Sequence, residues 1–252
     1  MTLSTIRNNP AKQKKVKTKK QKAIAATCAV AFWLLVWHVV SLCVGSELVL
    51  VSPVKVVQTL FTVIFDPDFL KTVWYSAARI LGGFFTALTL GTVLGWVASR
   101  FWVVETLLRP ITAVIKATPV ASFIILVLLW FSGKNLSVII SMLMVFPVIY
   151  MNVLEGIRSA DEKLLEMAQV FRLSVGKKLL YIYLPAVAPF FVSACSVSLG
   201  LCWKSGIAAE VIGTPDGSIG AVFYQAKIFL QTSELLLSLI HISEPTRHSL
   251  IS

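Results

Sequence analysis

Two ionisable residues stand within a small, apolar stretch of the sequence. Lys204 and Glu210 flank the segment Ser-Gly-Ile-Ala-Ala, directly after a long apolar run. Charged side chains are costly within a membrane and often mark transport pathways. Six positions on an α-helix turn by about 240°, so the two side chains do not pair unless the helix breaks. We interpret them as candidates for a gate or pathway lining, with an ordinary loop on the outer face as the alternative.

Recognisable catalytic and metal-binding sets are missing from the sequence. The three histidines are scattered, and two of them fall in the last dozen residues. The four cysteines lie in apolar stretches without Cys-x-x-Cys spacing. The phosphate-binding pattern Gly-x-x-x-x-Gly-Lys-Ser/Thr is also missing. We therefore expect a chain that is not an enzyme and that binds no metal and no cofactor directly.

A charged segment between two apolar runs is suited to bind another protein. In residues 158–171, Ser159 and Glu162 have the spacing of a helix capping box. Three apolar residues then recur at helical spacing, namely Leu164, Ala168 and Phe171. A helix this short and charged cannot cross a bilayer, so its apolar face must pack elsewhere. The chain's own helix ends and the lipid surface are two options, and a groove on a cytoplasmic protein is the more specific one.

The composition places these residues in a membrane protein. Of the 252 residues, 57% are hydrophobic and 14% charged, whereas soluble domains carry about 25% charged residues. The net charge of +11 comes mainly from residues 1–22, which hold eight basic residues and no acidic one. The remaining 230 residues hold 15 basic and 12 acidic ones. This distribution excludes a soluble nucleic-acid-binding domain and predicts a basic tail on a membrane protein.

Apolar runs of about 20 residues can each cross a bilayer as a helix. Five such spans are predicted, at residues 23–44, 79–98, 111–131, 136–152 and 186–203. They define an all-α, polytopic helical bundle. Basic residues concentrate in alternate loops, which places the N-terminus and the loop 155–178 in the cytoplasm. In the second span, small residues recur every four positions and predict a face for close helix packing: Gly83, Ala87, Gly91 and Gly95.

The loop and three other segments resemble permeases of binding-protein-dependent ABC importers, in the nitrate, sulfonate and taurine branch. Glu166-Met167-Ala168, followed by Leu-Pro at 184–185, resembles the EAA loop of that family. Residues 76–84, 109–133 and 208–220 resemble other family segments, and the resemblance covers about 53–234. The family has glycine where this chain has Arg172. Because only glycine takes a positive φ cheaply, we expect the bend to shift toward 174–176 or to need no glycine.

The resemblance implies a type I importer permease in a bacterial inner membrane. Two permease copies form the pathway as a homodimer, a cytoplasmic ABC ATPase dimer uses ATP, and an extracytoplasmic binding protein delivers substrate. The implied substrate is a small anion such as a sulfonate, taurine or nitrate, or a pyrimidine-type precursor. The residues implied in ATPase coupling are Leu164, Glu166, Met167, Ala168, Phe171 and Arg172. A bulky acidic side chain at position 168 is then expected to uncouple transport from ATP hydrolysis without disturbing the fold.

The predicted organisation has three parts. They are the cytoplasmic tail 1–22, a transmembrane domain 23–240 with its coupling loop at 155–185, and a tail at 241–252. The family has a sixth span, but residues 234–242 would cover only about 14 Å as a helix. We expect this span to be truncated and residues 241–252 to be an aberrant, unrelated tail. The alternative functions are a secondary transporter or channel subunit and a membrane scaffold.

Overall fold

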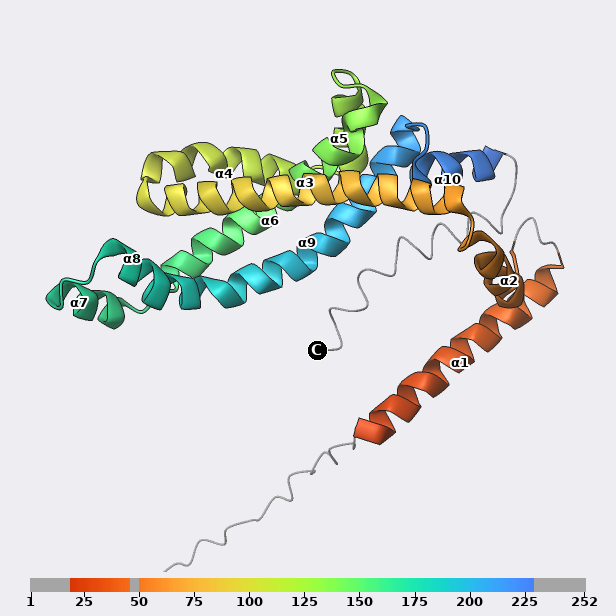
Figure 1. Cartoon of the computed structure of the whole chain (residues 1–252), viewed down its shortest axis with the longest axis horizontal. Helices are drawn as coiled ribbons and strands as arrows, with labels where there is room; N and C mark the ends of the chain where they lie inside the picture. The colour runs from red at the N-terminus through yellow and green to blue at the C-terminus, as the bar shows by residue number, and fades with distance from the viewer. Residues whose placement is uncertain (1–18, 46–49, 229–252) are drawn as a thin grey trace, which may run out of the picture. The chain divides into compact units, whose positions relative to one another are not determined.

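The computed structural model describes residues 19–45 and 50–228 (Figure 1). These residues form helices joined by short turns, with no strand among them. The chain divides into two units, residues 1–54 and 55–252. The first unit contributes α1 (Lys19–Val44), whose described side chains from Ile24 onward are mostly exposed. Most of the basic tail and the residues of the expected sixth-span truncation and aberrant tail lie outside the described residues.

The second unit holds most of the helices. In chain order they are α3 (Pro67–Arg100), α4 (Trp102–Ala117), α5 (Val120–Leu128), α6 (Gly133–Arg158), α7 (Glu162–Val170), α8 (Val175–Lys178), the π-helix η1 (Leu179–Tyr183), α9 (Leu184–Gly213) and α10 (Ile219–Ile228). The helix α2 (Pro53–Val63) begins at the boundary between the units. Among the described residues, four segments are long and apolar enough to cross a membrane: Ile24–Val44, Pro67–Arg100, Gly133–Arg158 and Val175–Gly213. The all-α, polytopic class predicted from the sequence is therefore confirmed.

The predicted third span, 111–131, is not a single straight helix. Its residues belong to α4 and α5, whose axes are bent by 107° at the break. Thr118 has an extended backbone with φ −90° and ψ 134°, as expected for a residue that precedes proline. Pro119 has no N–H for a helical hydrogen bond, so α4 ends and α5 begins in a new direction. The pair counts as a fifth span only if both halves are taken together.

Two of the long helices extend beyond the predicted spans. The Asp66 carboxylate caps α3 by accepting a hydrogen bond from the Asp68 N–H at 3.0 Å, with Pro67 in the first turn. A helix of 34 residues is about 51 Å long and exceeds a bilayer core of about 30 Å. The helix α9 likewise continues to Gly213. Residues 204–213 are therefore helical, and the loop proposed as the alternative for them is wrong.

The core of the second unit forms where α6 packs against α3 and α9, which lie alongside it in Figure 1. The small residues Gly83, Ala87, Gly91 and Gly95 are all buried on α3. A Cβ added at Gly91 would lie 3.0 Å from Ile149, and one added at Gly95 would lie 3.0 Å from Val153. Both neighbours belong to α6. The small residues thus allow close approach of two helices within one chain.

Candidate functional site

The helix α7 is capped by a residue other than the predicted one. The Asp161 carboxylate accepts a hydrogen bond from the Lys163 N–H at 2.9 Å and caps the first turn. Ser159 instead ends α6, and its hydroxyl donates to the Gly156 carbonyl at 2.8 Å. The predicted capping box of Ser159 and Glu162 is therefore wrong. The reason is that α6 continues as far as Arg158 and takes Ser159 as its own C-cap.

The apolar residues of α7 divide between two faces. Ala168 is fully buried and packs with Ala160, Leu165, Leu173 and Ile182 in a small core, here called the loop core. Leu164, Met167, Val170 and Phe171 are exposed. The predicted grouping of Ala168 with Leu164 and Phe171 on one binding face is therefore wrong. A bulky acid at Ala168 would enter the loop core, which contradicts the expectation that the fold would be undisturbed.

The bend after α7 lies at Arg172, where the resembling family has glycine. Arg172 has a φ of +49°. Its N–H donates to the Gln169 carbonyl at 3.0 Å, and the Leu173 N–H donates to the Ala168 carbonyl at 2.9 Å. These two bonds form a Schellman motif, the common end of a helix at a left-handed residue. The bend therefore does not move to 174–176, and the alternative that it needs no glycine is confirmed. The two bonds and the packing of Leu173 in the loop core offset a left-handed cost of about 1–2 kcal/mol.

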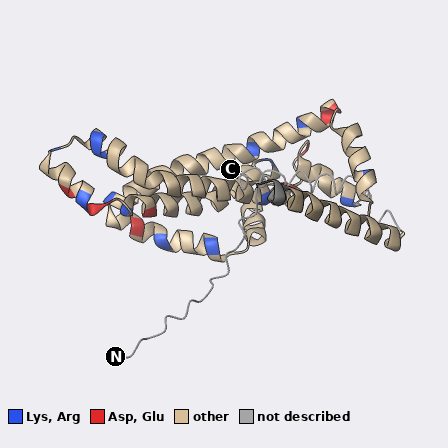
Figure 2. Ribbon diagram, turned by 90° about the horizontal axis from the view of Figure 1, so that it is seen from below, with Lys and Arg blue, Asp and Glu red and all other residues tan. Residues whose placement is uncertain are grey.

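In Figure 2 charged residues lie near the end of the second unit that carries α7 and α8 and again at the opposite end of its long helices, whose middle stretches are mostly uncharged. At the α7 end Arg158 of α6 forms an ion pair with Glu105 of α4, with an N–O distance of 2.5 Å. Glu166 and Arg172 are exposed beside the apolar face of α7. The combined surface is a short helix with an exposed apolar face and charged neighbours, which suits the groove of another protein.

Glu210 lies in a buried polar network that joins three helices. The Ser76 hydroxyl of α3 donates to Glu210 Oε2 at 2.7 Å, and the Gly220 N–H approaches the same oxygen at 3.4 Å. The Ile219 N–H donates to the Ser76 hydroxyl at 2.9 Å. A Cβ on Gly220 would overlap Glu210, so α10 can approach α9 this closely only with glycine there. Nothing in the sequence marks Ser76 as a partner of Glu210, except that it is a small polar residue in an apolar helix.

Lys204 and Glu210 do not meet in the structure. Lys204 is exposed on α9, whereas Glu210 is fully buried. Their separation agrees with the six-residue spacing on an unbroken helix. Glu210 holds α9 against α3 and α10 and does not line an open space in this conformation. Lys204 is left as the exposed member of the predicted pair.

Comparison of the sequence with known proteins places this chain in a family. Residues 87–243 match the family described as binding-protein-dependent transport system inner membrane component. The SsuC protein of Bacillus subtilis, named for aliphatic sulfonates transport, is 30% identical over 82% of this chain and 75% of its own length. The taurine transport permease TauC of Escherichia coli is 27% identical over 79% and 74%. The nitrate import permease NrtB of Synechocystis is 25% identical over 88% and 83%.

These matches agree with the bundle of membrane-spanning helices and with the resemblance found in the sequence. Permeases of this family are the non-catalytic membrane components of ABC importers, which overturns the alternative of a secondary transporter or channel subunit. The partners that such permeases have in general are an ATPase and a substrate-binding protein. The chain therefore belongs to the binding-protein-dependent transport inner membrane components, as a multi-pass ABC importer permease in the branch of the sulfonate, taurine and nitrate permeases.

Proposed function

We propose that the chain couples transport to ATP hydrolysis through the exposed face of α7, formed by Leu164, Met167, Val170 and Phe171. The observation that carries the proposal is the division of α7 into two apolar faces, of which one is packed in the loop core and the other is uncovered. A helix that fills a groove presents apolar anchors about one turn apart. Glu166 and Arg172 lie exposed beside these anchors and supply polar contacts to the same partner.

The loop core gives the exposed face a mechanical connection to the bundle. Ala168 of α7 packs in it together with Ile182 of η1, which leads directly into α9. Force applied to α7 by a closing ATPase dimer therefore reaches α9 through packed side chains. Interiors packed in this way move as units and do not deform continuously. This connection supports a role for α7 in coupling and gives Ala168 an internal role.

The proposed orientation places α7 and the N-terminus in the cytoplasm. Arg100, Arg158, Lys177 and Lys178 all lie at the α7 end of the bundle or within the loop, in agreement with the positive-inside rule. In this orientation a cytoplasmic ATPase dimer reaches α7, and a binding protein approaches from the opposite side. Two copies of the chain form the pathway, and ATP is used by the partner subunit. The substrate is a small sulfonate-bearing molecule or nitrate, because three relatives are named for sulfonates, taurine and nitrate.

The coupling surface is tested by charge substitution on each side of α7. Met167→Asp places a charge on the exposed apolar face, and Gln169→Asp places the same charge at another exposed position of the same helix. Both variants are expected to fold, since neither side chain is buried. We expect Met167→Asp to lose co-purification with the ATPase and to lower ATP-driven uptake at least tenfold, while Gln169→Asp keeps both. Equal behaviour of the two variants would refute the proposed coupling surface.

The substrate is tested in proteoliposomes that contain the permease, its ATPase and its binding protein. Labelled taurine, an alkyl sulfonate, nitrate and a pyrimidine precursor are each supplied outside. We expect ATP-dependent accumulation of one of the first three compounds. Accumulation of the pyrimidine alone would refute this substrate assignment without affecting the coupling role of α7.

A further inference from the structure

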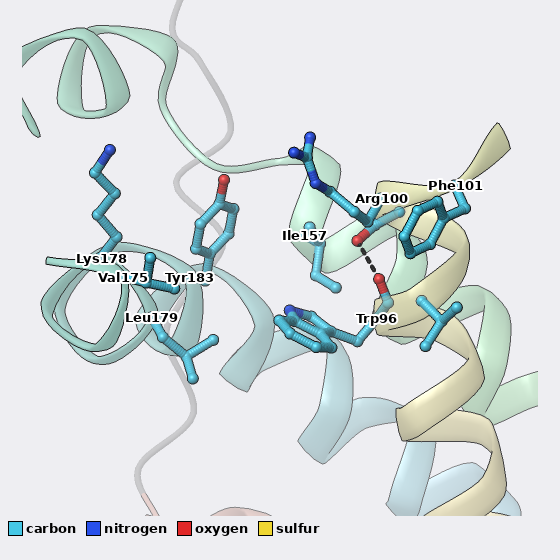
Figure 3. A pocket seen from close by; sticks show the side chains of 10 residues that line it. Trp96, Arg100, Phe101, Ile157, Val175, Lys178, Leu179 and Tyr183 are labelled. Atoms are coloured by element: carbon cyan, nitrogen blue, oxygen red, sulfur yellow. Dashed lines mark hydrogen bonds between the residues drawn. The ribbon is translucent and has the colours of Figure 1, made fainter. Parts of the chain in front are cut away.

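Two neighbouring cavities lie beside the C-terminal end of α3, and Figure 3 shows the first of them. The first, of about 580 Å³, contains two basic side chains and is here called the basic cavity. The second, of about 500 Å³, is lined by apolar surface and is here called the apolar cavity. The two cavities share four lining residues: Trp96, Ile157, Leu179 and Tyr183. The two cavities therefore adjoin one another, one with basic residues in its lining and the other with apolar surface.

Two cations supply the charge of the basic cavity. Arg100 and Lys178 line the basic cavity, and none of the described residues that line either cavity is acidic. No ion pair involves either cation within the described part of the chain. In Figure 3 the polar ends of Arg100, Lys178 and Tyr183 point to the same side, while Trp96 and Leu179 lie on the other. The arrangement leaves two unpaired positive charges beside a hydroxyl group, above an aromatic and aliphatic floor.

The apolar cavity lies along the membrane-spanning helices. Besides the shared residues, it is lined by Thr92 and Val93 of α3, Val153 of α6, and Leu184 and Val187 of α9. Thr92 and Val93 lie further from the C-terminal end of α3 than Arg100 does, and Val153 lies further from the C-terminal end of α6 than Arg158 does. Trp96 lies one turn from the end of α3, where tryptophan is typical of the membrane interface. The apolar cavity thus lies toward the middle of the long helices, and the basic cavity lies at the end of α3.

The backbone is widened where both cavities meet. The residues Leu179–Tyr183 form a π-helix between α8 and α9, a rare feature that is frequent at functional sites. Its first and last residues, Leu179 and Tyr183, both line both cavities. The wider turn therefore presents two side chains to both cavities. This is an observation independent of the two charges.

We propose that the two adjoining cavities together bind one anionic phospholipid. The phosphate lies between Arg100, Lys178 and the Tyr183 hydroxyl, and an acyl chain follows the apolar cavity past Val93. Basic pockets between membrane helices bind anionic headgroups in this way, and Arg and Lys reach the interface with their long apolar stems. A small anion alone would leave the apolar cavity unfilled, and an apolar helix would leave both charges unpaired. Only the choice of leaflet rests on the proposed orientation.

The test measures lipid retention by the full-length chain. The protein is purified in detergent and incubated with vesicles of phosphatidylglycerol, or of phosphatidylcholine with the same acyl chains. Bound lipid is then counted by native mass spectrometry. We expect phosphatidylglycerol to be retained at least tenfold better than phosphatidylcholine. The variant Arg100→Gln/Lys178→Gln is expected to abolish this preference. The control Lys163→Gln/Lys177→Gln removes two exposed charges that line neither cavity and is expected to keep it.

A second pair of variants tests the apolar cavity. Val93→Phe fills the apolar cavity and is expected to lower retention of phosphatidylglycerol severalfold, while Leu90→Phe, on the same helix but outside the cavity, is not. The proposal is overturned if the charge variant and its control retain the lipid equally. It is also overturned if soluble glycerol phosphate competes for binding as well as the phospholipid does. A further contrary outcome is an unmodified protein that forms a lipid-free dimer which Val93→Phe dissociates. None of these outcomes depends on coupling to an ATPase.

Discussion

Two adjacent glycines of α3 offer a direct test of helix packing in this protein. Gly83 is buried against α6, where an added Cβ would lie 2.9 Å from the Ser141 Cβ and 3.2 Å from the Met142 backbone nitrogen. The carbonyl of Val138 would be closer still. Gly82 points the other way, and nothing lies within 4 Å of its added Cβ. Since the atoms near Gly83 include backbone, Gly83→Ala must push α3 and α6 apart.

The size of the effect follows from two opposing contributions. Alanine is favoured over glycine inside a helix by about 1 kcal/mol, and this gain applies equally to both positions. Overpacking of an already filled interface costs about 1–3 kcal/mol. Gly82→Ala is therefore expected to raise the free energy of unfolding by up to about 1 kcal/mol. The free energy of unfolding of Gly83→Ala is expected to be about 1–3 kcal/mol lower than that of Gly82→Ala, and this difference reports the packing cost.

The comparison is made by denaturant-induced unfolding of both variants in the same detergent. Each variant adds one methyl group to the same helix, so the helix-propensity contribution cancels in the difference. We expect the midpoint of Gly82→Ala to equal or exceed that of the unmodified chain, and the midpoint of Gly83→Ala to be lower. Equal midpoints for the two variants would refute the close packing of α3 on α6.

Three further predictions concern the loop and the buried network. Arg172→Gly removes the left-handed strain and is expected to stabilise the loop by about 0.5–1 kcal/mol, seen as slower amide hydrogen exchange in α7, whereas Arg172→Ala is not. Ala168→Asp buries an unpaired charge in the loop core and is expected to expose the loop to limited proteolysis; a loop as resistant as the unmodified one would contradict this. Glu210→Ala leaves the Ser76 hydroxyl without its acceptor and is expected to lower the free energy of unfolding by about 1–3 kcal/mol, measured by thermal unfolding. Glu210→Gln is expected to retain most of the stability, and equal losses in the two variants would contradict the hydrogen-bonding role.

The long helices and the small-residue stripe could be predicted because their signals are local. Hydropathy over about 20 residues indicates a span, and the spacing of Gly83, Gly91 and Gly95 repeats with the helical turn. The direction taken after Pro119 could not be predicted in the same way. Proline explains why the helix stops, but the 107° bend also depends on how α5 packs against α6 and α9.

The α7 loop shows why a candidate site can be located without its geometry. Leu164 and Leu165 are neighbours of identical hydropathy, so the sequence alone does not say which of them packs against the rest of the chain. The loop core decides this choice, because Leu165 and Ala168 pack in it with Ile182, which lies 14 residues after Ala168 in the sequence. The bend at Arg172 is similar, since its left-handed backbone is held by bonds to α7 and by the packing of Leu173.

The structure holds α9 near both of its ends, which bears on how a permease of this family transmits motion. One end follows η1, whose Ile182 lies in the loop core beneath α7, and the other end carries Glu210 in its network with Ser76 and α10. A 30-residue helix is about 45 Å long, so these attachments lie near opposite sides of a bilayer core of about 30 Å. Pro189 near the start of α9 removes one helical hydrogen bond. If α7 moves as proposed, we expect α9 either to bend at Pro189 or to move as a unit and load the Glu210 network, so that α9 connects the α7 loop to that network.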